Sequence, residues 1–297
     1  MKPFVQRLAL GRSDVDRAAH LRNDSEWSAS QLYSDATRVV RLRGVEIPLL
    51  DDAVVFTGIR DDDVLAFLGE ADGIVYAAAL GETVEYPESW HWTSLRTCGA
   101  ALTDREVGLA TTAIALNNWH KNHTHCPRCG SDTFVTHSGW VRQCVADGSE
   151  HYPRTDPAII TLITDSEDRL LLARQPVWPA GNYSVIAGFC EPGETFEAAV
   201  IRECLEEVGL HVGEPTYLAS QPWPFPASMM IGYHVRALST EIVVDDDEIE
   251  AAMWVSREEL VALCADERVK LPSRVSIARK MIEHWYGEEL PHHWSRT

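Results

Sequence analysis

The chain has 297 residues, of which 45% are hydrophobic and 24% are charged, and its formal net charge at pH 7 is -19. The length suits one large domain or two smaller ones, and the composition is that of a folded soluble protein. The negative charge argues against sequence-independent binding to nucleic acid, which uses Lys and Arg to neutralise phosphates. A phosphate-containing substrate stays compatible with it if metal ions supply the positive charge.

The beginning of the chain, MKPFVQRLALGRSDVD, meets charges before an apolar segment can form, so we expect no signal peptide. The longest uninterrupted apolar run, residues 74–80, is far too short to cross a bilayer. The seven cysteines are an odd number and do not suggest a disulfide framework. We therefore expect a cytoplasmic protein that makes no membrane contact.

Residues 1–120 contain short apolar runs such as VVRL, AVVFTG and VLAFLG, separated by Gly and Asp. This pattern is typical of strands and turns. Thr103 and Glu106 then form a T-x-x-E capping box, which predicts a helix that runs to about His120. The sequence therefore predicts an N-terminal α+β domain.

Three cysteines cluster in the next segment, residues 121–155. Cys126 and Cys129 form a C-x-x-C knuckle followed by glycine, and Cys144 comes after 14 intervening residues. A zinc ribbon with four cysteines would have its last thiolate at position 147, where this chain has Asp147. Because a carboxylate oxygen can ligate zinc, Asp147 is the first candidate for the fourth ligand.

Two alternatives to Asp147 stay open. The site could be free of metal, or a nearby histidine could replace the fourth cysteine, the candidates being His125, His137 and His151. With its ligand set complete, the segment would be a structural zinc-ribbon insert, since ribbon sites leave no open position for chemistry.

Residues 156–297 mix strand candidates such as AIITLITD, RLLLAR and SMMIGYHVRAL with helical segments, which suggests one α/β domain. A second capping box begins at Ser256, and Pro272 opens a last helix that Gly287 could terminate.

The most informative part of this region is a helix predicted over residues 195–208. At about 100° per residue, apolar side chains fall on one side, and Glu203, Glu206 and Glu207 fall within about 100° of arc on a neighbouring side. Like charges four residues apart destabilise a helix by a few tenths of a kcal/mol, and a bound cation would reverse that. Oxygen ligands suit Mg²⁺ or Mn²⁺, although a solvated acidic face is the alternative for such a pattern alone.

The segment around this helix matches every fixed position of the pattern G-x5-E-x7-R-E-U-x-E-E-x-G-U, the Nudix box, through Gly188, Glu194, Arg202, Glu203, Glu206, Glu207 and Gly209. Cys204 at the first bulky position is a mild departure. The segment therefore resembles the Nudix hydrolase family. The resemblance implies a C-terminal Nudix α/β/α sandwich that hydrolyses a nucleoside diphosphate linked to another group.

The resemblance also implies roles for individual residues. Catalytic metal ions would be bound by one backbone carbonyl and three glutamates, namely Ala187, Glu203, Glu206 and Glu207. Glu207 or a metal-held hydroxide would activate water, Arg202 would hold the carboxylates by ion pairing, and Glu194 would stabilise the loop–helix–loop. Glu248 resembles a further metal-binding glutamate of the family, although the acidic run at 245–248 could instead be a solvated turn.

A proline-rich segment, SQPWPFPAS at residues 220–228, follows the helix. Three prolines in five residues exclude a helix or a central strand, so two aromatic rings are held on a stiff loop. Taken alone, these rings either pin the loop to the core or bind a flat heterocycle.

The segment resembles the characteristic motif of the NADH pyrophosphatases, a Nudix subfamily. This resemblance implies a nicotinamide-nucleotide pocket built with Gln221, Trp223, Phe225 and Ser228. Phe189 resembles a ring that stacks on the bound base. Tyr152 resembles an aromatic that sandwiches the base, either from the same chain or from the partner subunit of a homodimer.

Taken together, these resemblances imply a metal-dependent enzyme that hydrolyses NAD(H) to NMN(H) and AMP, and that also removes NAD caps from RNA 5′ ends. It would use catalytic Mg²⁺ or Mn²⁺ and one structural zinc ion. One alternative is a Nudix hydrolase of another nucleoside diphosphate, such as ADP-ribose or a diadenosine polyphosphate. A second is a non-catalytic zinc-ribbon module, against which the intact helix glutamates argue.

Overall fold

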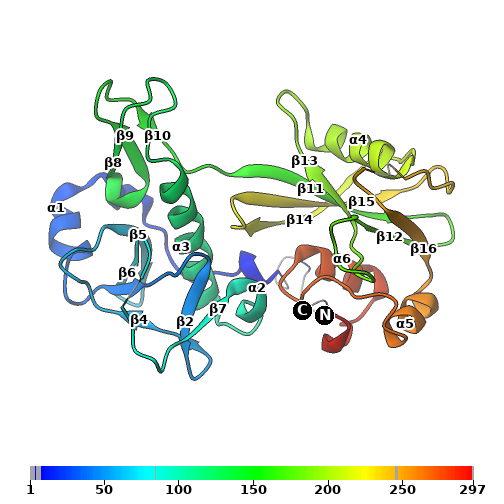
Figure 1. Ribbon diagram of the computed structural model, residues 1–297, viewed down its shortest axis with the longest axis horizontal. Coiled ribbons are helices and arrows are strands. Elements are labelled where there is room, and N and C mark those ends of the chain that lie inside the picture. The colour runs from blue at the N-terminus through cyan, green and yellow to red at the C-terminus, as the bar shows by residue number, and fades with distance from the viewer. Residues whose placement is uncertain (1–3, 5–7, 84, 245–246, 296–297) are drawn as a thin grey trace. The chain divides into compact units, whose positions relative to one another are not determined.

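The computed structural model describes the whole chain except residues 1–3, 5–7, 84, 245–246 and 296–297 (Figure 1). The chain forms two compact units. The C-terminal unit comprises residues 1–11, 156–221 and 228–297, and the N-terminal unit comprises residues 12–155 and 222–227. Two short segments do not belong to the same unit as their neighbours in the sequence. Residues 1–11 belong to the C-terminal unit, and the proline-rich loop, residues 222–227, belongs to the N-terminal unit.

Over residues 38–94, the described part of the N-terminal unit forms two small sheets, with strand orders β4-β1-β6-β5 and β3-β2-β7. The strands are β1 (Arg38–Val40), β2 (Glu46–Leu50), β3 (Ala53–Val54), β4 (Phe56–Thr57), β5 (Leu65–Ala71), β6 (Ile74–Ala79) and β7 (His91–Ser94). The helices are α1 (Ser25–Trp27), α2 (Leu95–Cys98) and α3 (Asp104–Asn122). Leu32, Val39 and Phe67 are fully buried in the core of this unit. The expected α+β class is confirmed.

Helix α3 begins at the predicted capping box. The Thr103 hydroxyl accepts a hydrogen bond from Glu106 N at 3.3 Å, and the Glu106 carboxylate accepts one from Thr103 N at 2.9 Å. The same carboxylate accepts a hydrogen bond from Val54 N at 2.8 Å, which joins the start of the helix to β3. The capping residue thus positions the helix as well as starting it.

Three short antiparallel strands follow α3 in the order β10-β9-β8, namely β8 (Thr133–Thr136), β9 (Val141–Cys144) and β10 (Glu150–His151). His120 near the end of α3 is buried against them. Its Nε2 bonds to Gly139 O at 2.8 Å, and Arg142 donates to its Nδ1 at 3.1 Å. These partners select the neutral tautomer that carries its proton on Nε2.

We predict that His120 makes the unfolding free energy depend on pH. Burial lowers its pKa to about 4, from about 6.5 in the unfolded chain, and the Arg142 charge adds to the shift. The unfolded state therefore binds more protons between these values, so this contribution to stability, about 3 kcal/mol, is lost as the pH falls from 6.5 to 4. Urea unfolding across this range should show a smaller loss for His120→Gln than for the parent, and equal losses would contradict the assignment.

The C-terminal unit is built on one mixed sheet with the order β14-β15-β11-β12-β16, and β13 also pairs with β11. The strands are β11 (Asp156–Thr164), β12 (Leu170–Arg174), β13 (Ile186–Phe189), β14 (Thr216–Trp223), β15 (Ser228–Arg236) and β16 (Ala251–Val255). Strands β11 and β15 are parallel, in a register that pairs Asp156 with Ser228. The prolines at the end of β14 are tolerated because β14 lies at an edge of the sheet.

Helices cover both faces of this sheet, namely α4 (Phe196–Val208), α5 (Arg257–Ala265) and α6 (Ile277–Tyr286). Side chains alternate along β11, so Ile159 and Ile163 pack in one buried cluster with residues of α4. Ile160 and Leu162 pack in a second cluster with residues of α5 and α6, which Leu8 also joins. This is the arrangement of a sheet buried on both sides, and the predicted α/β/α sandwich is confirmed.

The capping box at Ser256 and the left-handed Gly287 at the end of α6 are confirmed. The predicted start of α6 at Pro272 is wrong. Residues 273–276 form a turn closed by a 3.0 Å backbone hydrogen bond, and the helix begins after Ser276, whose hydroxyl caps it. Within the described residues, no helix combines the length and apolarity that a membrane span requires.

Candidate active site and zinc ribbon

Three glutamates of the C-terminal unit bring carboxylate oxygens within 4.8 Å of one another, and we call them the carboxylate cluster: Glu203, Glu207 and Glu248. Glu203 and Glu207 lie one turn apart on α4 and are buried, whereas Glu248 precedes β16 and is exposed. Positions 245 and 246, in the same acidic run, lie outside the described residues. Because like charges at this separation repel one another, the cluster is suited to a cation.

Helix α4 is positioned by caps at both ends. The Thr195 hydroxyl accepts a hydrogen bond from Ala198 N at 3.2 Å, so the helix begins one residue later than predicted, and Gly209 closes it with a φ of 68°. The face that carries Cys204 and Val208 is fully buried. These contacts fix which side of the helix presents the glutamates.

Arg202 ties these glutamates to the loop before the helix. It donates two parallel hydrogen bonds to the Glu194 carboxylate, at 2.8 and 2.9 Å, and a third to Phe189 O at 3.0 Å. Its remaining terminal nitrogen donates to Glu203 at 2.8 Å and to Glu206 at 3.0 Å. The guanidinium holds the pKa of Glu194 down at about 2. One cation thus orients three carboxylates, while Glu206 stays exposed outside the carboxylate cluster.

The electrostatic field of the site is strongly negative. Burial raises the pKa of Glu203, Arg202 opposes the rise, and the charges of Glu206 and Glu248 add to it. Burial together with the nearby Glu207 and Glu203 charges also raises the pKa of Cys204 to about 12. A group of hard oxygen donors in such a field fits Mg²⁺ or Mn²⁺, which prefer carboxylate ligands.

Gly188 allows β13 to pass very close to the carboxylate cluster. A Cβ atom built on Gly188 would lie 2.0 Å from Glu203 Oε1, far inside van der Waals contact. The neighbouring Ala187, whose carbonyl is a predicted metal ligand, pairs with Ile160 of β11 in the sheet. Only glycine lets the strand backbone approach this carboxylate.

We predict that Gly188→Ala abolishes most of the enzymatic activity without unfolding the protein. The methyl group would displace Glu203, and a misplacement of about 1 Å at a reacting centre can lower the rate about 100-fold. Gly213→Ala is the matched control, because its Cβ would meet its nearest neighbour at an ordinary 3.7 Å. Steady-state kinetics and thermal unfolding of both variants check this, and a Gly188→Ala protein as active as the parent would refute it.

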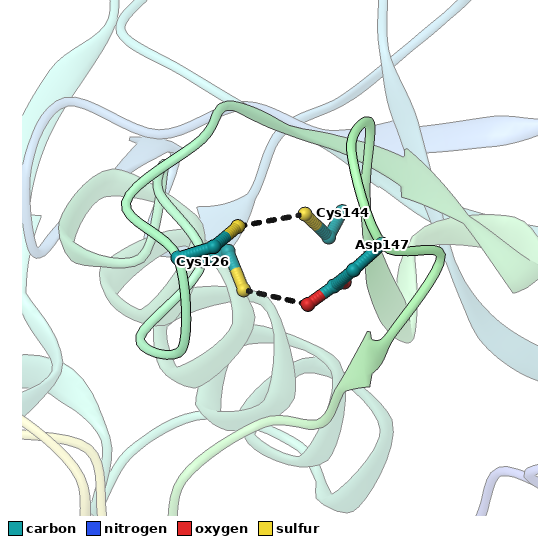
Figure 2. A group of neighbouring side chains, drawn as sticks. Cys126, Cys144 and Asp147 are labelled. Carbon is teal, nitrogen blue, oxygen red and sulfur yellow. Dashed lines mark hydrogen bonds between the residues drawn. The ribbon is translucent and has the colours of Figure 1, made fainter.

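The second group of metal-ligand side chains lies in the N-terminal unit and consists of Cys126, Cys129, Cys144 and Asp147 (Figure 2). Cys129 Sγ lies 3.5 Å from Cys144 Sγ, and Cys126 Sγ lies 3.9 Å from Asp147 Oδ2. Ligand atoms around a tetrahedral zinc ion with bonds of about 2.3 Å stand about 3.8 Å apart. The spacing of the four ligand atoms therefore fits zinc.

The two halves of this group have the same backbone geometry. In the first, Gly130 N donates to Cys126 O at 2.9 Å and Gly130 has a φ of 75°. In the second, Gly148 N donates to Cys144 O at 3.2 Å and Gly148 has a φ of 69°. Each half is therefore a knuckle. Asp147 occupies the position in the second knuckle that Cys129 occupies in the first.

Hydrogen bonds prepare these ligands to bind a cation. Burial opposes ionisation of Cys126, but its hydrogen bond with Ser149 and hydrogen bonds from backbone amides lower its pKa to about 6. Ser149 also donates from its amide and its hydroxyl to Asp147, at 2.9 and 2.6 Å, and lowers the pKa of that carboxyl to about 2. The group of ligand side chains includes none of the three candidate histidines, His125, His137 and His151.

We predict that Asp147→Ala weakens zinc binding by more than about tenfold, because loss of a ligand should cost at least as much as loss of a supporting hydrogen bond. Zinc affinity can be measured by competition with a chromogenic chelator. His151→Ala is the control and should bind zinc like the parent. If His151→Ala loses zinc and Asp147→Ala keeps it, histidine is the fourth ligand.

The residues expected to bind the substrate divide between the two units. Phe189 at the end of β13 and Tyr152 after β10 are 61% and 63% exposed, which leaves their rings free to stack. Ser228 is half-buried at the start of β15. Gln221 is fully buried and donates from Nε2 to Val275 O at 3.1 Å, so its side chain holds the sheet edge to the segment before α6.

Trp223 and Phe225 belong to the N-terminal unit, as part of the proline-rich loop. Two further residues of that unit contact this loop, namely Arg96 on α2 and Asn118 on α3. The sequence did not predict the contact that either residue makes with the loop. Neither belongs to a motif, and their contact with the loop is formed only by the tertiary structure.

Comparison with known proteins gives matches along nearly the whole chain. Three family descriptions match in succession: the NADH pyrophosphatase-like rudimentary NUDIX domain over residues 19–119, the NADH pyrophosphatase zinc ribbon domain over 121–152, and the NUDIX domain over 154–279. Among solved structures, a NUDIX hydrolase from Nitrosomonas europaea matches with a TM-score of 0.44 and 20% identity, covering 57% of this chain and 96% of that one.

Two curated relatives have similar names. The NAD-capped RNA hydrolase NudC of Mycobacterium bovis is 37% identical over 296 residues, which cover 93% of this chain and 94% of the relative. The human NAD-capped RNA hydrolase NUDT12 is 38% identical over 330 residues, which cover 91% of this chain and 71% of the relative.

Proposed function

Because the chain belongs to the NADH pyrophosphatase group of the Nudix hydrolases, we propose that it hydrolyses the pyrophosphate of NAD(H) to NMN(H) and AMP. The observation that carries the proposal is the carboxylate cluster, which has two members on α4 and one of them, Glu203, bound by Arg202, in a chain with the proline-rich motif. We extend the proposal to NAD caps on RNA 5′ ends, as the relatives are NAD-capped RNA hydrolases by name.

The catalytic cations in this proposal are Mg²⁺ or Mn²⁺. The carboxylate cluster would hold them, together with Glu206 and the carbonyl of Ala187. When bound, such ions neutralise charge on the pyrophosphate and lower the pKa of water. The close approach of β13 to Glu203 at Gly188 supports a site shared by this strand and α4.

The protein's own groups perform the rest of the reaction. Phe189 stacks on the base of the bound dinucleotide. The Glu207 carboxylate accepts a proton from water as the water oxygen attacks one phosphorus, the bridging P–O bond breaks, and NMN(H) and AMP leave. Arg202 keeps Glu203 and Glu206 oriented throughout, because its hydrogen bonds to them do not depend on the substrate.

The nicotinamide nucleotide would be recognised by Trp223, Phe225 and Ser228. Gln221 supports this pocket from within the sheet rather than by touching the substrate, since its side chain is fully buried. The ribbon would hold one structural zinc ion and take no part in the chemistry, because all four of its ligands are protein side chains.

We also propose a homodimer located in the cytoplasm. The highly exposed ring of Tyr152 is suited to reach the site of a partner subunit. All seven cysteines are free thiols, as is usual for proteins in a reducing compartment. With a net charge of -19, the protein would grip the body of an RNA weakly, so decapping would depend on the cap itself.

The test is mass spectrometry of the products formed from NADH and Mn²⁺. We expect the parent to release NMNH and AMP and Glu207→Gln to release neither at a comparable rate, since the variant lacks the carboxylate that accepts the proton. Glu214→Gln changes an exposed glutamate of the same unit outside the carboxylate cluster, and it should match the parent.

ADP-ribose at the same concentration is the competing substrate. A clear preference for ADP-ribose over NADH would overturn the proposed substrate and leave the Nudix chemistry standing. A Glu207→Gln protein as fast as the parent would overturn the assignment of the proton acceptor.

A further inference from the structure

The proline-rich loop, residues 222–227, joins two strands of the C-terminal unit yet belongs to the N-terminal unit. It connects β14, the edge strand of the mixed sheet, to its neighbour β15. Within the loop, Pro224 is buried and both aromatic rings are half-buried. Two side chains of the N-terminal unit contact this loop.

The first is Arg96 on α2. Its guanidinium carbon lies 5.2 Å from the centroid of the Trp223 ring and 4.5 Å from that of the Phe225 ring. The two rings pack edge to face, with centroids 5.1 Å apart and planes at 76°. One cation thus contacts both rings of the pair.

The Arg96 guanidinium makes no hydrogen bond or ion pair with any other described residue, so its electrostatic contacts are the cation–π contacts with the two rings. The residue as a whole is exposed, and partial desolvation of its guanidinium lowers its pKa from the ordinary value. A cation over an aromatic face is attracted by the ring even at an exposed site, and Arg96 contacts two rings at once. The backbone beneath it is fixed too, because Arg96 N donates to the capping hydroxyl of Ser94.

The second side chain is Asn118 on α3. Its Nδ2 donates hydrogen bonds to Pro224 O at 3.0 Å and to Pro226 O at 3.3 Å. Both acceptors are backbone carbonyls of the turn that follows β14. Asn118 satisfies them from outside and fixes the loop backbone, while Arg96 fixes the rings.

We propose that Arg96, with Asn118, positions the Trp223–Phe225 pair for recognition of the nicotinamide half of the substrate. The N-terminal unit is then a specificity element, since it supplies both residues that hold the recognition loop. The inference rests on the proposed function, because that function places the two rings in the nicotinamide-nucleotide pocket. A loop held in its binding conformation before the substrate arrives loses less entropy on binding.

The test compares Arg96→Met, which keeps the length and removes the charge, with Arg96→Lys, which keeps a cation near the rings. For Arg96→Met we expect KM for NADH to rise about tenfold, equivalent to about 1.4 kcal/mol, with kcat nearly unchanged. KM for ADP-ribose, which lacks the nicotinamide, should move less than about twofold. Arg96→Lys should recover most of the affinity.

Arg22→Met is the matched control. Arg22 lies 3.5 Å over the Trp140 ring in the same unit, so this change removes a similar cation–ring contact away from the loop. It should leave both KM values unchanged. The loop itself is followed by fluorine NMR of 5-fluorotryptophan protein, with the Trp223 signal assigned by its loss in Trp223→Phe. That signal should shift in Arg96→Met and not in Arg22→Met.

An unchanged KM for NADH in Arg96→Met overturns the inference, as does an equal rise for both substrates or a fall in kcat alone. If the parent cleaves ADP-ribose but not NADH, the proposed function fails first. The Trp223 signal then decides the positioning role alone: a shift in Arg96→Met but not in Arg22→Met supports it, and no shift in Arg96→Met overturns it.

Discussion

Carboxylates held within 4.8 Å of one another repel, and two members of this group are buried, where water screens them poorly. The C-terminal unit counters this repulsion with one cation of its own. Arg202 lies between Glu194, Glu203 and Glu206 and binds all three, and the capped helix prevents the glutamates from turning away. Arg202 does not cancel the negative charge of the carboxylate cluster, because it binds only Glu203 of its three members. The negative field suits divalent metal ions and the phosphates that accompany them.

The N-terminal unit contributes differently. Its knuckles bring four ligand atoms to the spacing of a tetrahedral zinc site, and the buried His120–Arg142 contact joins the ribbon sheet to α3. The same helix, through Asn118, holds the proline-rich loop. Ribbon, helix and loop therefore form one connected structure within this unit.

The sequence was sufficient where function depends on spacing along one element. The positions of the glutamates on α4 and the knuckle position of Asp147 could be predicted because neighbours in sequence fix them. Contacts between distant segments could not. No local pattern showed that Arg96 would contact Trp223 and Phe225, or that residues 1–11 would join the C-terminal unit. The helix start predicted at Pro272 was wrong, because residues 273–276 form a turn and α6 begins after it.

The central claim is that Glu203, Glu207 and Glu248 together bind a divalent cation. Its most direct test is electron paramagnetic resonance titration of Mn²⁺ into the zinc-loaded protein, which counts bound and free ions without relying on turnover. Glu248→Gln should bind Mn²⁺ more than about tenfold more weakly than the parent, while Glu214→Gln should bind it equally well. If Glu248→Gln binds as many Mn²⁺ ions as tightly as the parent, the three glutamates do not bind the cation together, and the proposed metal site is wrong.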